Sequence, residues 1–332
     1  MKTSKLHLLA ISFLVGLSIT ACKKSDNTSN TLTGTEVTAS QDAEAQDAQS
    51  DNVDQSVDNI ADALEANNFS ALKSTEVGGP TWTISSSDTT TFPKTITLTF
   101  ATDTTINGET FKQTGTITIV VSLTQNKWPW RNYIKRTITF SNFKTENDSA
   151  SFAVNGTRVM TRKEVSISPA ITPNNFLTLT SLRLSVLDSI KSNMTFGITC
   201  GSFTGSFTRD VNRTRQAIAH FEKIASTRIW HQVYLKDTLI FKGSVTGTNL
   251  MDSTYSRVIS ENNPITFTRC ALLVPVISSG ELTITRDTPK GTKEAVITYQ
   301  KEECKTLVTV TTSGGKIRQF ERRVNRLYKK WW

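Results

Sequence analysis

The sequence predicts an all-β protein, and three observations support this fold class. First, β-branched apolar residues alternate with threonine in segments such as 95–100, 116–121 and 282–285, which is typical of strands with one buried face. Second, turn-forming pairs such as Asn107-Gly108 separate these segments, which favours antiparallel hairpins. Third, about 250 residues share this pattern, enough for a substantial core. We therefore expect a long antiparallel β-meander that forms a sandwich or two stacked β units.

The same patterns predict further strands and turns. The strands are expected at 137–140 and 177–180, and the turns at Asn155-Gly156, Lys242-Gly243 and Gly314-Gly315. The β domain is expected to span residues 81–332, either as one unit or as two halves that meet near 207–214.

The N-terminus carries a targeting signal. Two lysines precede an apolar run, residues 6–19, which is shorter than the roughly 20 residues needed to span a bilayer. The run ends in Ile-Thr-Ala-Cys at residues 19–22, which resembles the lipobox of bacterial lipoproteins. The resemblance implies that residues 1–21 are a signal peptide and that the thiol of Cys22 receives the lipid. Multiple acyl chains make such an attachment durable, so we expect a membrane anchor at Cys22.

Two polar segments connect this anchor to the β domain. Residues 22–40 are rich in Ser, Thr, Asn and Asp, which predicts a disordered tether. Residues 41–76 are expected to contain a short acidic helix, because 41–65 hold eight acids and no base and carry apolar residues at helical spacing: Val53, Val57, Ile60, Ala61 and Leu64. This helix would dock a basic partner, pack on its own basic domain or stay partly disordered.

The β domain is strongly basic. Residues 81–332 contain 33 bases and 18 acids, and outside the cytoplasm this surplus favours acidic glycans, lipopolysaccharide or anionic lipid over nucleic acid as partners. The surplus is concentrated in the C-terminal tail, 316–332, where arginines and lysines surround an aliphatic and aromatic stripe that ends in Trp331 and Trp332. This tail is predicted to form a basic amphipathic helix, which would touch a membrane interface, cap the sheet or pair with the acidic helix.

Several short sequence segments carry more information than the strand pattern alone. Asp42-Ala-Glu-Ala-Gln-Asp-Ala follows the lipobox, and Pro93-Lys-Thr-Ile-Thr-Leu-Thr-Phe, Arg136-Thr-Ile-Thr-Phe-Ser-Asn-Phe, Val154-Asn-Gly-Thr-Arg and Val274-Pro-Val-Ile-Ser-Ser-Gly follow in the β domain. In these sequence segments the chain resembles the uncharacterised β-rich lipoproteins of Bacteroidota. The resemblance implies an outer-membrane lipoprotein, and it brings no catalytic residues. Lys23-Lys24-Ser25-Asp26, just after the lipid, resemble the charged export signals of Bacteroidota lipoproteins, which favours the cell surface over the periplasmic face. The basic tail departs from this family pattern.

Three cysteines remain after Cys22. In an oxidising compartment they allow one disulfide, and we favour Cys270 with Cys304, because both lie beside strand-like runs about 34 positions apart, which closes a loop of stabilising size. Cys200 is then a buried thiol or, alternatively, a redox or metal residue.

The sequence offers no catalytic motif. Beyond the signal peptide it has two histidines, His220 and His231, and it lacks HExxH, GxSxG and paired-cysteine metal spacing. Glu302 and Glu303 cannot flank one glycosidic bond, because adjacent strand residues point to opposite faces. We therefore expect a non-enzyme without a cofactor or metal.

Two kinds of surface position are candidate sites. Trp128, Trp130 and Tyr133 form an aromatic cluster that would stack on sugars or plug the end of a β unit. Six Asp-Ser or Asp-Thr triplets are similar to the O-glycosylation signal of exported Bacteroidota proteins, although such pairs also form turns; their hydroxyl residues are Thr89, Thr104, Ser149, Ser189, Thr238 and Ser253.

Two functions from different classes follow from these features. The first is a non-catalytic envelope lipoprotein with a structural or adhesive β domain. The second is a carbohydrate-binding surface lipoprotein of a nutrient-capture system, with the aromatic cluster as its platform.

Overall fold

The chain is known from a computed structural model that describes most of the β domain. The described residues are 81–84, 92–106, 109–123, 134–148, 150–172, 178–224, 230–248, 253–270, 275–288 and 291–322. The expected signal peptide, tether and acidic helix lie outside them, as do residues 323–332 of the tail. Within these ranges, no helix has the length and apolar character needed to cross a membrane.

The described residues form strands and one short 3-10 helix, η2 (Tyr234–Lys236). The strands are β1 (Thr81–Ile84), β2 (Lys94–Ile106), β3 (Glu109–Leu123), β4 (Ile134–Glu146), β5 (Ala150–Ser168), β6 (Ser181–Cys200), β7 (Phe203–Lys223), β8 (Trp230–Gln232), β9 (Thr238–Thr248), β10 (Thr254–Ile259), β11 (Ile265–Arg269), β12 (Pro275–Thr288), β13 (Gly291–Glu302), β14 (Lys305–Thr312) and β15 (Ile317–Arg322).

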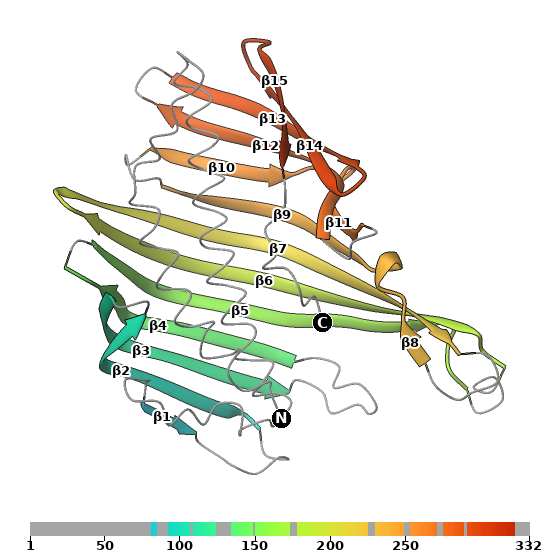
Figure 1. Cartoon of the computed structure of the whole chain (residues 1–332), viewed down its shortest axis with the longest axis horizontal. Coiled ribbons are helices and arrows are strands. Elements are labelled where there is room, and N and C mark those ends of the chain that lie inside the picture. Colours follow the sequence, from blue (N-terminus) through green and yellow to red (C-terminus); the bar gives the residue numbers. More distant parts are fainter. Residues whose placement is uncertain are drawn as a thin grey trace.

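The predicted all-β antiparallel meander is confirmed. The 15 strands belong to one sheet in the order β1-β2-β3-β4-β5-β6-β7-β9-β10-β12-β13-β14-β15, while β8 pairs with β7, and β11 pairs with β9 and β12. Figure 1 shows β1 at one end of this sheet and the β13–β15 region at the other. Hydrogen bonding is unbroken between these ends, so the described strands form one sheet rather than the separate sheets of a sandwich.

The expected boundary near 207–214 lies inside a strand. Strand β7 is 21 residues long and pairs with β6 along its whole length and with β9 from Thr208 to Ile218. The sheet is therefore continuous at this position. The apolar core consists of three clusters: a large one on β2–β7, a small one on β5–β7, β9 and β10, and one on β10 and β12–β14.

Two of the predicted turns are wrong, because both glycines lie within strands. Gly156 is in β5 and Gly243 is in β9. Both have positive φ, and a Cβ atom on either would lie 2.2 Å from a backbone oxygen of the neighbouring strand. Glycine is needed here for close approach of two strands, which a local sequence pattern does not distinguish from a turn.

Two further elements also differ from the sequence prediction. Residues 178–180 are not in a strand, because the neighbouring strand β7 ends at Lys223 and leaves them little to pair with. Residues 317–322 of the tail form strand β15 instead of a helix and pair with β14. The edge of β14 offers backbone groups that a strand can satisfy, and this pairing overrides the helical periodicity of the tail.

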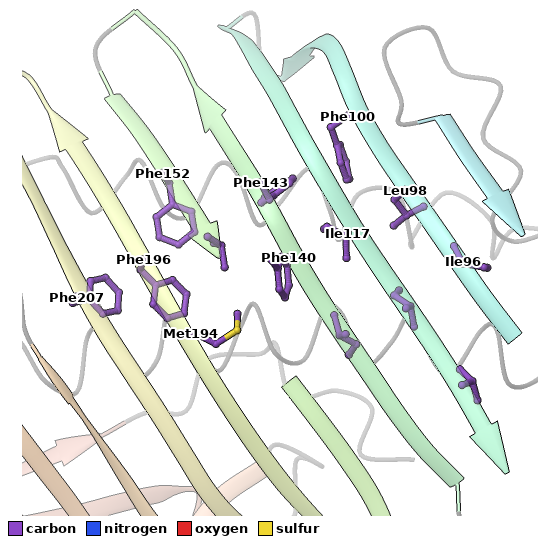
Figure 2. Close-up of a cluster of buried hydrophobic side chains, with 14 of the residues drawn as sticks. Ile96, Leu98, Phe100, Ile117, Phe140, Phe143, Phe152, Met194, Phe196 and Phe207 are labelled. Carbon is purple, nitrogen blue, oxygen red and sulfur yellow. The ribbon is translucent and has the colours of Figure 1, made fainter. Parts of the chain in front are cut away.

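The larger core cluster is aromatic at its centre. Phe196 and Phe207 stack with ring centroids 4.6 Å apart, and the rings of Phe100 and Phe143 meet edge-on at 5.0 Å. Figure 2 shows these rings beside Ile96, Leu98 and Ile117. They come from β2, β3, β4, β6 and β7, so one face of the sheet buries the apolar half of the alternating pattern.

Candidate functional site

The two faces of the sheet have different chemistry. Because directly paired residues on antiparallel strands point to the same side, the strand register assigns each side chain to a face. We call the face that carries the apolar core the arginine face, and the opposite one the threonine face.

Three cross-strand rows of directly paired residues define the arginine face. The first contains Lys94, Val121, Arg136, Met160, Ile190, Arg213, Gly243, Ile259, Leu282, Ile297, Val310 and Arg318. The second contains Ile96, Ile119, Ile138, Arg158, Ser192, Val211, Val245, Arg257, Ile284, Ala295 and Thr312, and the third contains Leu98, Ile117, Phe140, Gly156, Met194, Arg209, Gly247, Tyr255, Arg286 and Lys293.

These rows combine apolar side chains with bases. Nine of their residues are lysine or arginine and none is an acid. Several of the bases are nearly inaccessible: the exposed fraction is 2% for Arg209, 3% for Arg136, 4% for Arg158 and 6% for Arg257. Buried arginine is unusual in protein cores, so this face is more than a standard apolar packing surface.

A fourth row on the same face contains an acid between two bases. Asp188 pairs in register with Arg162 on β5 and Arg215 on β7, and its side chain is 1% exposed. Its carboxylate accepts hydrogen bonds from Arg162 Nε at 3.2 Å and Arg215 Nη2 at 2.7 Å. Burial opposes ionisation, but the two guanidinium charges outweigh it and hold the pKa of Asp188 below its usual value.

The threonine face carries rows of hydroxyl groups. One row contains Thr83, Thr97, Thr118, Thr139, Thr157, Asn193, Asp210, Thr246, Ser256 and Thr285. Adjacent strands lie about 4.8 Å apart, and alternate residues of a strand lie about 6.8 Å apart. Within this row the hydroxyl groups therefore repeat at the spacing of the strands, interrupted by Asn193 and Asp210 on β6 and β7, and every side chain of the row is partly or fully exposed.

A neighbouring row on this face is tied together by hydrogen bonds. The hydroxyls of Thr208 and Thr248 lie 3.1 Å apart. Asp287 accepts hydrogen bonds from Thr254 and Thr292, each at 2.8 Å, and these two bonds lower the pKa of its carboxyl group. Such contacts hold the side chains in fixed positions, as a recognition surface requires.

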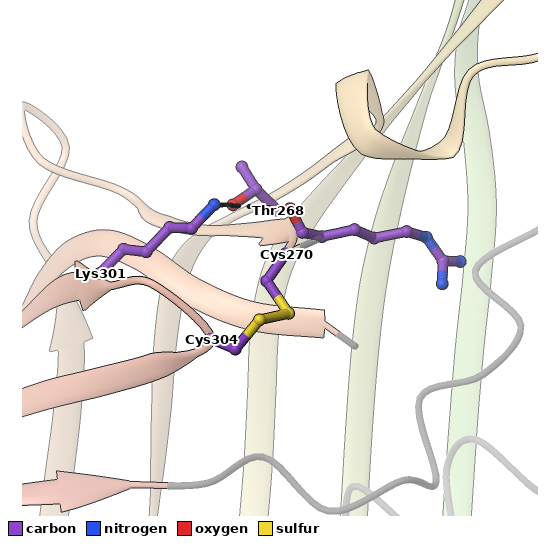
Figure 3. The surroundings of a disulfide bond; sticks show 5 residues. Thr268, Cys270, Lys301 and Cys304 are labelled. Atoms are coloured by element: carbon purple, nitrogen blue, oxygen red, sulfur yellow. Dashed lines mark hydrogen bonds between the residues drawn. A yellow bond between two sulfur atoms is a disulfide. The ribbon is translucent and has the colours of Figure 1, made fainter. Parts of the chain in front are cut away.

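The structure joins Cys270 to Cys304, the two cysteines paired in the sequence analysis. Their sulfurs are bonded, and the bridge connects the segment after β11 to the turn between β13 and β14 (Figure 3). Lys301 lies beside it and donates hydrogen bonds to Thr268 Oγ1 and to the carbonyl of Arg269, each at 3.4 Å. The bridge thus closes the corner where β11 meets the C-terminal strands.

A second buried acid lies near His220. Asp237 is fully buried and accepts hydrogen bonds from the backbone N–H of His220 at 3.1 Å and from Gln232 Nε2 at 2.7 Å. Burial is the largest influence and raises the pKa of this carboxyl group. His231 is exposed on β8 and pairs with Glu222. Among the described residues, no three His, Cys, Asp or Glu side chains form a metal-binding group.

The predicted surface sites are only partly within the described residues. Cys22, Trp128, Trp130 and Tyr133 lie outside them, the last three in the connection between β3 and β4. Thr89 and Ser149 also lie outside, and for Thr104 and Cys200 only the backbone position, in β2 and β6, is given.

The other three glycosylation candidates occupy different environments. Ser189 is in the interior of β6, Thr238 begins β9, and Ser253 precedes β10. Their aspartates therefore do not all form turns, since Asp188 is in mid-strand and ion-paired.

Comparison with known proteins gives no match to a family model, to a curated protein or to a solved structure. The two faces of the sheet therefore supply the functional argument. The sequence analysis missed the arginine face, although its signal was present: Arg209, Arg213 and Arg215 follow the two-residue period of a strand. The spacing of these arginines can be seen in the sequence, but their position on the same face as Arg158 and Arg257 follows only from the strand register.

Proposed function

We propose that this protein is an outer-membrane lipoprotein, anchored through a lipid on Cys22, with a non-catalytic structural or adhesive β domain. The threonine face is its contact surface. The observation that carries this proposal is the accessible row of polar side chains that crosses the sheet from β1 to β12, in which all members except Asn193 and Asp210 carry hydroxyl groups.

The geometry of this face favours an extended partner. A repeating array of donors and acceptors can form many equivalent hydrogen bonds with a repeating polymer, and each bond adds little alone, about 0.5–1.5 kcal/mol. Envelope polysaccharide is such a polymer. The contact is therefore expected to depend on many weak bonds and not on one pocket.

Sedimentation with insoluble polysaccharide from the producing cells tests this role. Thr118 and Thr139 are direct neighbours on β3 and β4, so the double variant Thr118→Val/Thr139→Val removes two adjacent hydroxyls while it keeps the β-branched shape. We expect binding to weaken by roughly tenfold, because two hydrogen bonds of about 0.5–1.5 kcal/mol each are lost. The matched control is Val120→Thr/Val159→Thr, which adds hydroxyls on the same face and is expected to bind at least as well as the wild type.

The same experiment separates this role from the carbohydrate-binding alternative. If Trp128→Ala abolishes binding while the threonine variant binds normally, the aromatic cluster between β3 and β4 is the platform and the proposed role of the threonine face is wrong. If the wild type binds none of the envelope polysaccharides, the adhesive form of the proposal is lost.

Protease shaving of intact cells tests the anchor and the location. We expect the β domain to be digested on whole cells and the Cys22→Ala variant to be released from the membrane fraction, with a periplasmic protein as the leakage control. Protection of the wild-type domain would place it on the periplasmic side instead.

The glycosylation sites are a separate part of this proposal. Ser189, Thr238 and Ser253, together with Thr89, Thr104 and Ser149, are proposed to carry O-glycans. The intact mass of the native protein is expected to exceed that of the lipidated peptide chain. A mass equal to lipid plus peptide would remove all six sites.

A further inference from the structure

One part of the threonine face, which we call the neutral platform, carries no charge. It comprises three neighbouring rows on strands β1–β5. The first is the β1–β5 part of the row described above, from Thr83 to Thr157. The second contains Thr81, Thr99, Thr116 and Ser141, and the third contains Thr95, Val120, Thr137 and Val159. All of these side chains are partly or fully exposed.

Charged residues begin where the platform ends. Along β4, Lys135 and Lys144 lie on either side of it. Beyond β5, Lys191 pairs with Val159, and Asp210 on β7 ends the run of uncharged residues in the first row. From the spacing of neighbouring strands and of alternate residues, the platform measures about 19 Å across the strands and about 14 Å along them. Figure 1 shows β1–β5 together at one end of the sheet.

We propose that the neutral platform binds an uncharged polysaccharide. This inference rests on the proposed function, because it assigns a ligand class to the same contact surface. The composition of the chain, with 38 lysines and arginines against 29 acids, favours an acidic partner. The platform itself favours the opposite class.

The lack of charge is the first argument. When an acidic polymer contacts a protein surface, its anions lose water, and this loss costs free energy unless bases take the place of the water. The platform has no lysine or arginine for that role. An uncharged chain that covers the platform buries no ion of either partner, so the platform selects against acidic polymers.

The chemistry of threonine is the second argument. Its hydroxyl group both donates and accepts hydrogen bonds, as a sugar hydroxyl does, and its methyl group is apolar, as are the C–H groups of a sugar ring. Val120 and Val159 add apolar area to the third row, where they alternate with threonines. A polysaccharide complements both kinds of group, whereas a small polar ion would leave the methyl groups uncovered.

The support beneath the platform is the third argument. The residues that alternate with it in β2–β4 belong to the largest core cluster, and Ile96, Ile119 and Ile138 are only 0–1% exposed. Their packing fixes the strands that carry the threonines. Preorganised side chains lose little entropy on binding, so that many weak hydrogen bonds add up to a measurable affinity.

Binding to separated envelope polysaccharides tests the inference. Anion exchange divides the polysaccharides of the producing cells into a neutral and an acidic fraction, and each fraction is immobilised on beads. We expect the full lipoprotein, in a non-ionic detergent, to bind the neutral beads. Because salt screens charges only, we expect the dissociation constant to change by less than about twofold between about 50 and about 500 mM salt.

Two pairs of hydroxyl deletions locate the contact. Thr97→Val/Thr118→Val removes adjacent hydroxyls from the platform, and we expect it to weaken binding to the neutral fraction roughly tenfold. The matched control Thr246→Val/Thr285→Val removes two hydroxyls from the same row on β9 and β12, outside the platform, and is expected to bind as the wild type does.

Two charge variants test the ligand class. Lys135→Gln/Lys191→Gln removes two bases at the border of the platform and is expected to leave binding to the neutral fraction unchanged. Thr118→Lys places a charge at its centre and is expected to weaken that binding by more than about tenfold, since the contact would then bury an unpaired ion. Circular dichroism checks that each variant keeps its sheet, and if Thr118→Lys unfolds, the other variants still decide.

The outcomes separate this inference from the proposed function. Preference for the acidic fraction, with an affinity that falls as salt is added or as the two lysines are removed, would overturn the inference and leave the contact role of the threonine face intact. Equal weakening by the platform and control pairs would overturn the assignment to β1–β5. Binding to neither fraction would remove the adhesive role itself.

Discussion

Replacing Asp188 by asparagine is expected to destabilise the sheet strongly. The carboxylate is 1% exposed and forms ion pairs with Arg162 and Arg215, so the variant leaves two guanidinium groups facing each other without their shared anion. Breaking a buried pair costs about 3–5 kcal/mol. The two arginine side chains are 21% and 24% exposed, and this access to water places the expected loss near the lower limit, about 3 kcal/mol.

The loss is expected to depend on pH with a definite sign. The pKa of Asp188 is lower in the folded protein than the ordinary value of an aspartate, because the two guanidinium groups favour the charged carboxylate. A group with a lowered folded pKa contributes stability that is complete above the unfolded pKa and is lost as pH falls through the folded pKa. The difference in unfolding free energy between wild type and Asp188→Asn is therefore expected to be largest near neutral pH and to shrink below about pH 4.

Urea denaturation at several pH values, with the disulfide intact, measures both effects. Asp210→Asn is the matched control, because Asp210 is an exposed acid on the threonine face and surface substitutions usually change stability by less than about 0.5 kcal/mol. Equal destabilisation by the two variants, or a difference that persists unchanged in acid, would refute the argument from the buried ion pairs.

Two further stability predictions concern the backbone and the covalent framework. The variant Gly156→Ala is expected to lower the free energy of unfolding by about 2–3 kcal/mol, because alanine is strained at this positive φ and its methyl group would clash with the Asn193 carbonyl. The control Gly197→Ala, whose methyl group would have its nearest neighbour at 3.5 Å, is expected to lower it by less than about 1 kcal/mol. Equal losses in urea denaturation would contradict this explanation of Gly156. Replacing Cys270 and Cys304 together by alanine is expected to lower the free energy of unfolding by about 4 kcal/mol, because the disulfide no longer restricts the unfolded chain across a separation of 34 residues. Thermal melting of this variant beside the wild type with its disulfide intact measures the loss.

The strand pattern was readable from the sequence because one face of the sheet is apolar. Segments 95–100, 116–121, 137–140 and 282–285 all lie in strands, and each alternates apolar residues with threonine. This alternation reports burial on one side, which is what the sheet provides. Elements defined by pairing across the sheet were harder to predict. Residues 317–322 belong to the tail that was predicted to be helical, and their strand conformation depends on pairing with the edge of β14.

Glycine was the least reliable sequence signal. Gly315 lies in the turn before β15, as the sequence predicted, and a Cβ atom added there would meet only open space. Gly156 and Gly243 have similar local sequences and also positive φ, but they lie where neighbouring backbones approach closely. Both situations select glycine for the same conformational reason, so only the long-range register separates them.

The candidate surfaces show the same division between local and long-range information. Each strand presents its own alternation, so single arginines at even spacing are visible in the sequence. Their assembly into rows depends on which residues pair across neighbouring strands, as Arg162 does with Asp188 and Asp188 with Arg215. A shift of the register by one residue would move every side chain of a strand to the other face. Without this long-range register, the arginines of β5 and β7 could not be placed on one side of the sheet with Asp188.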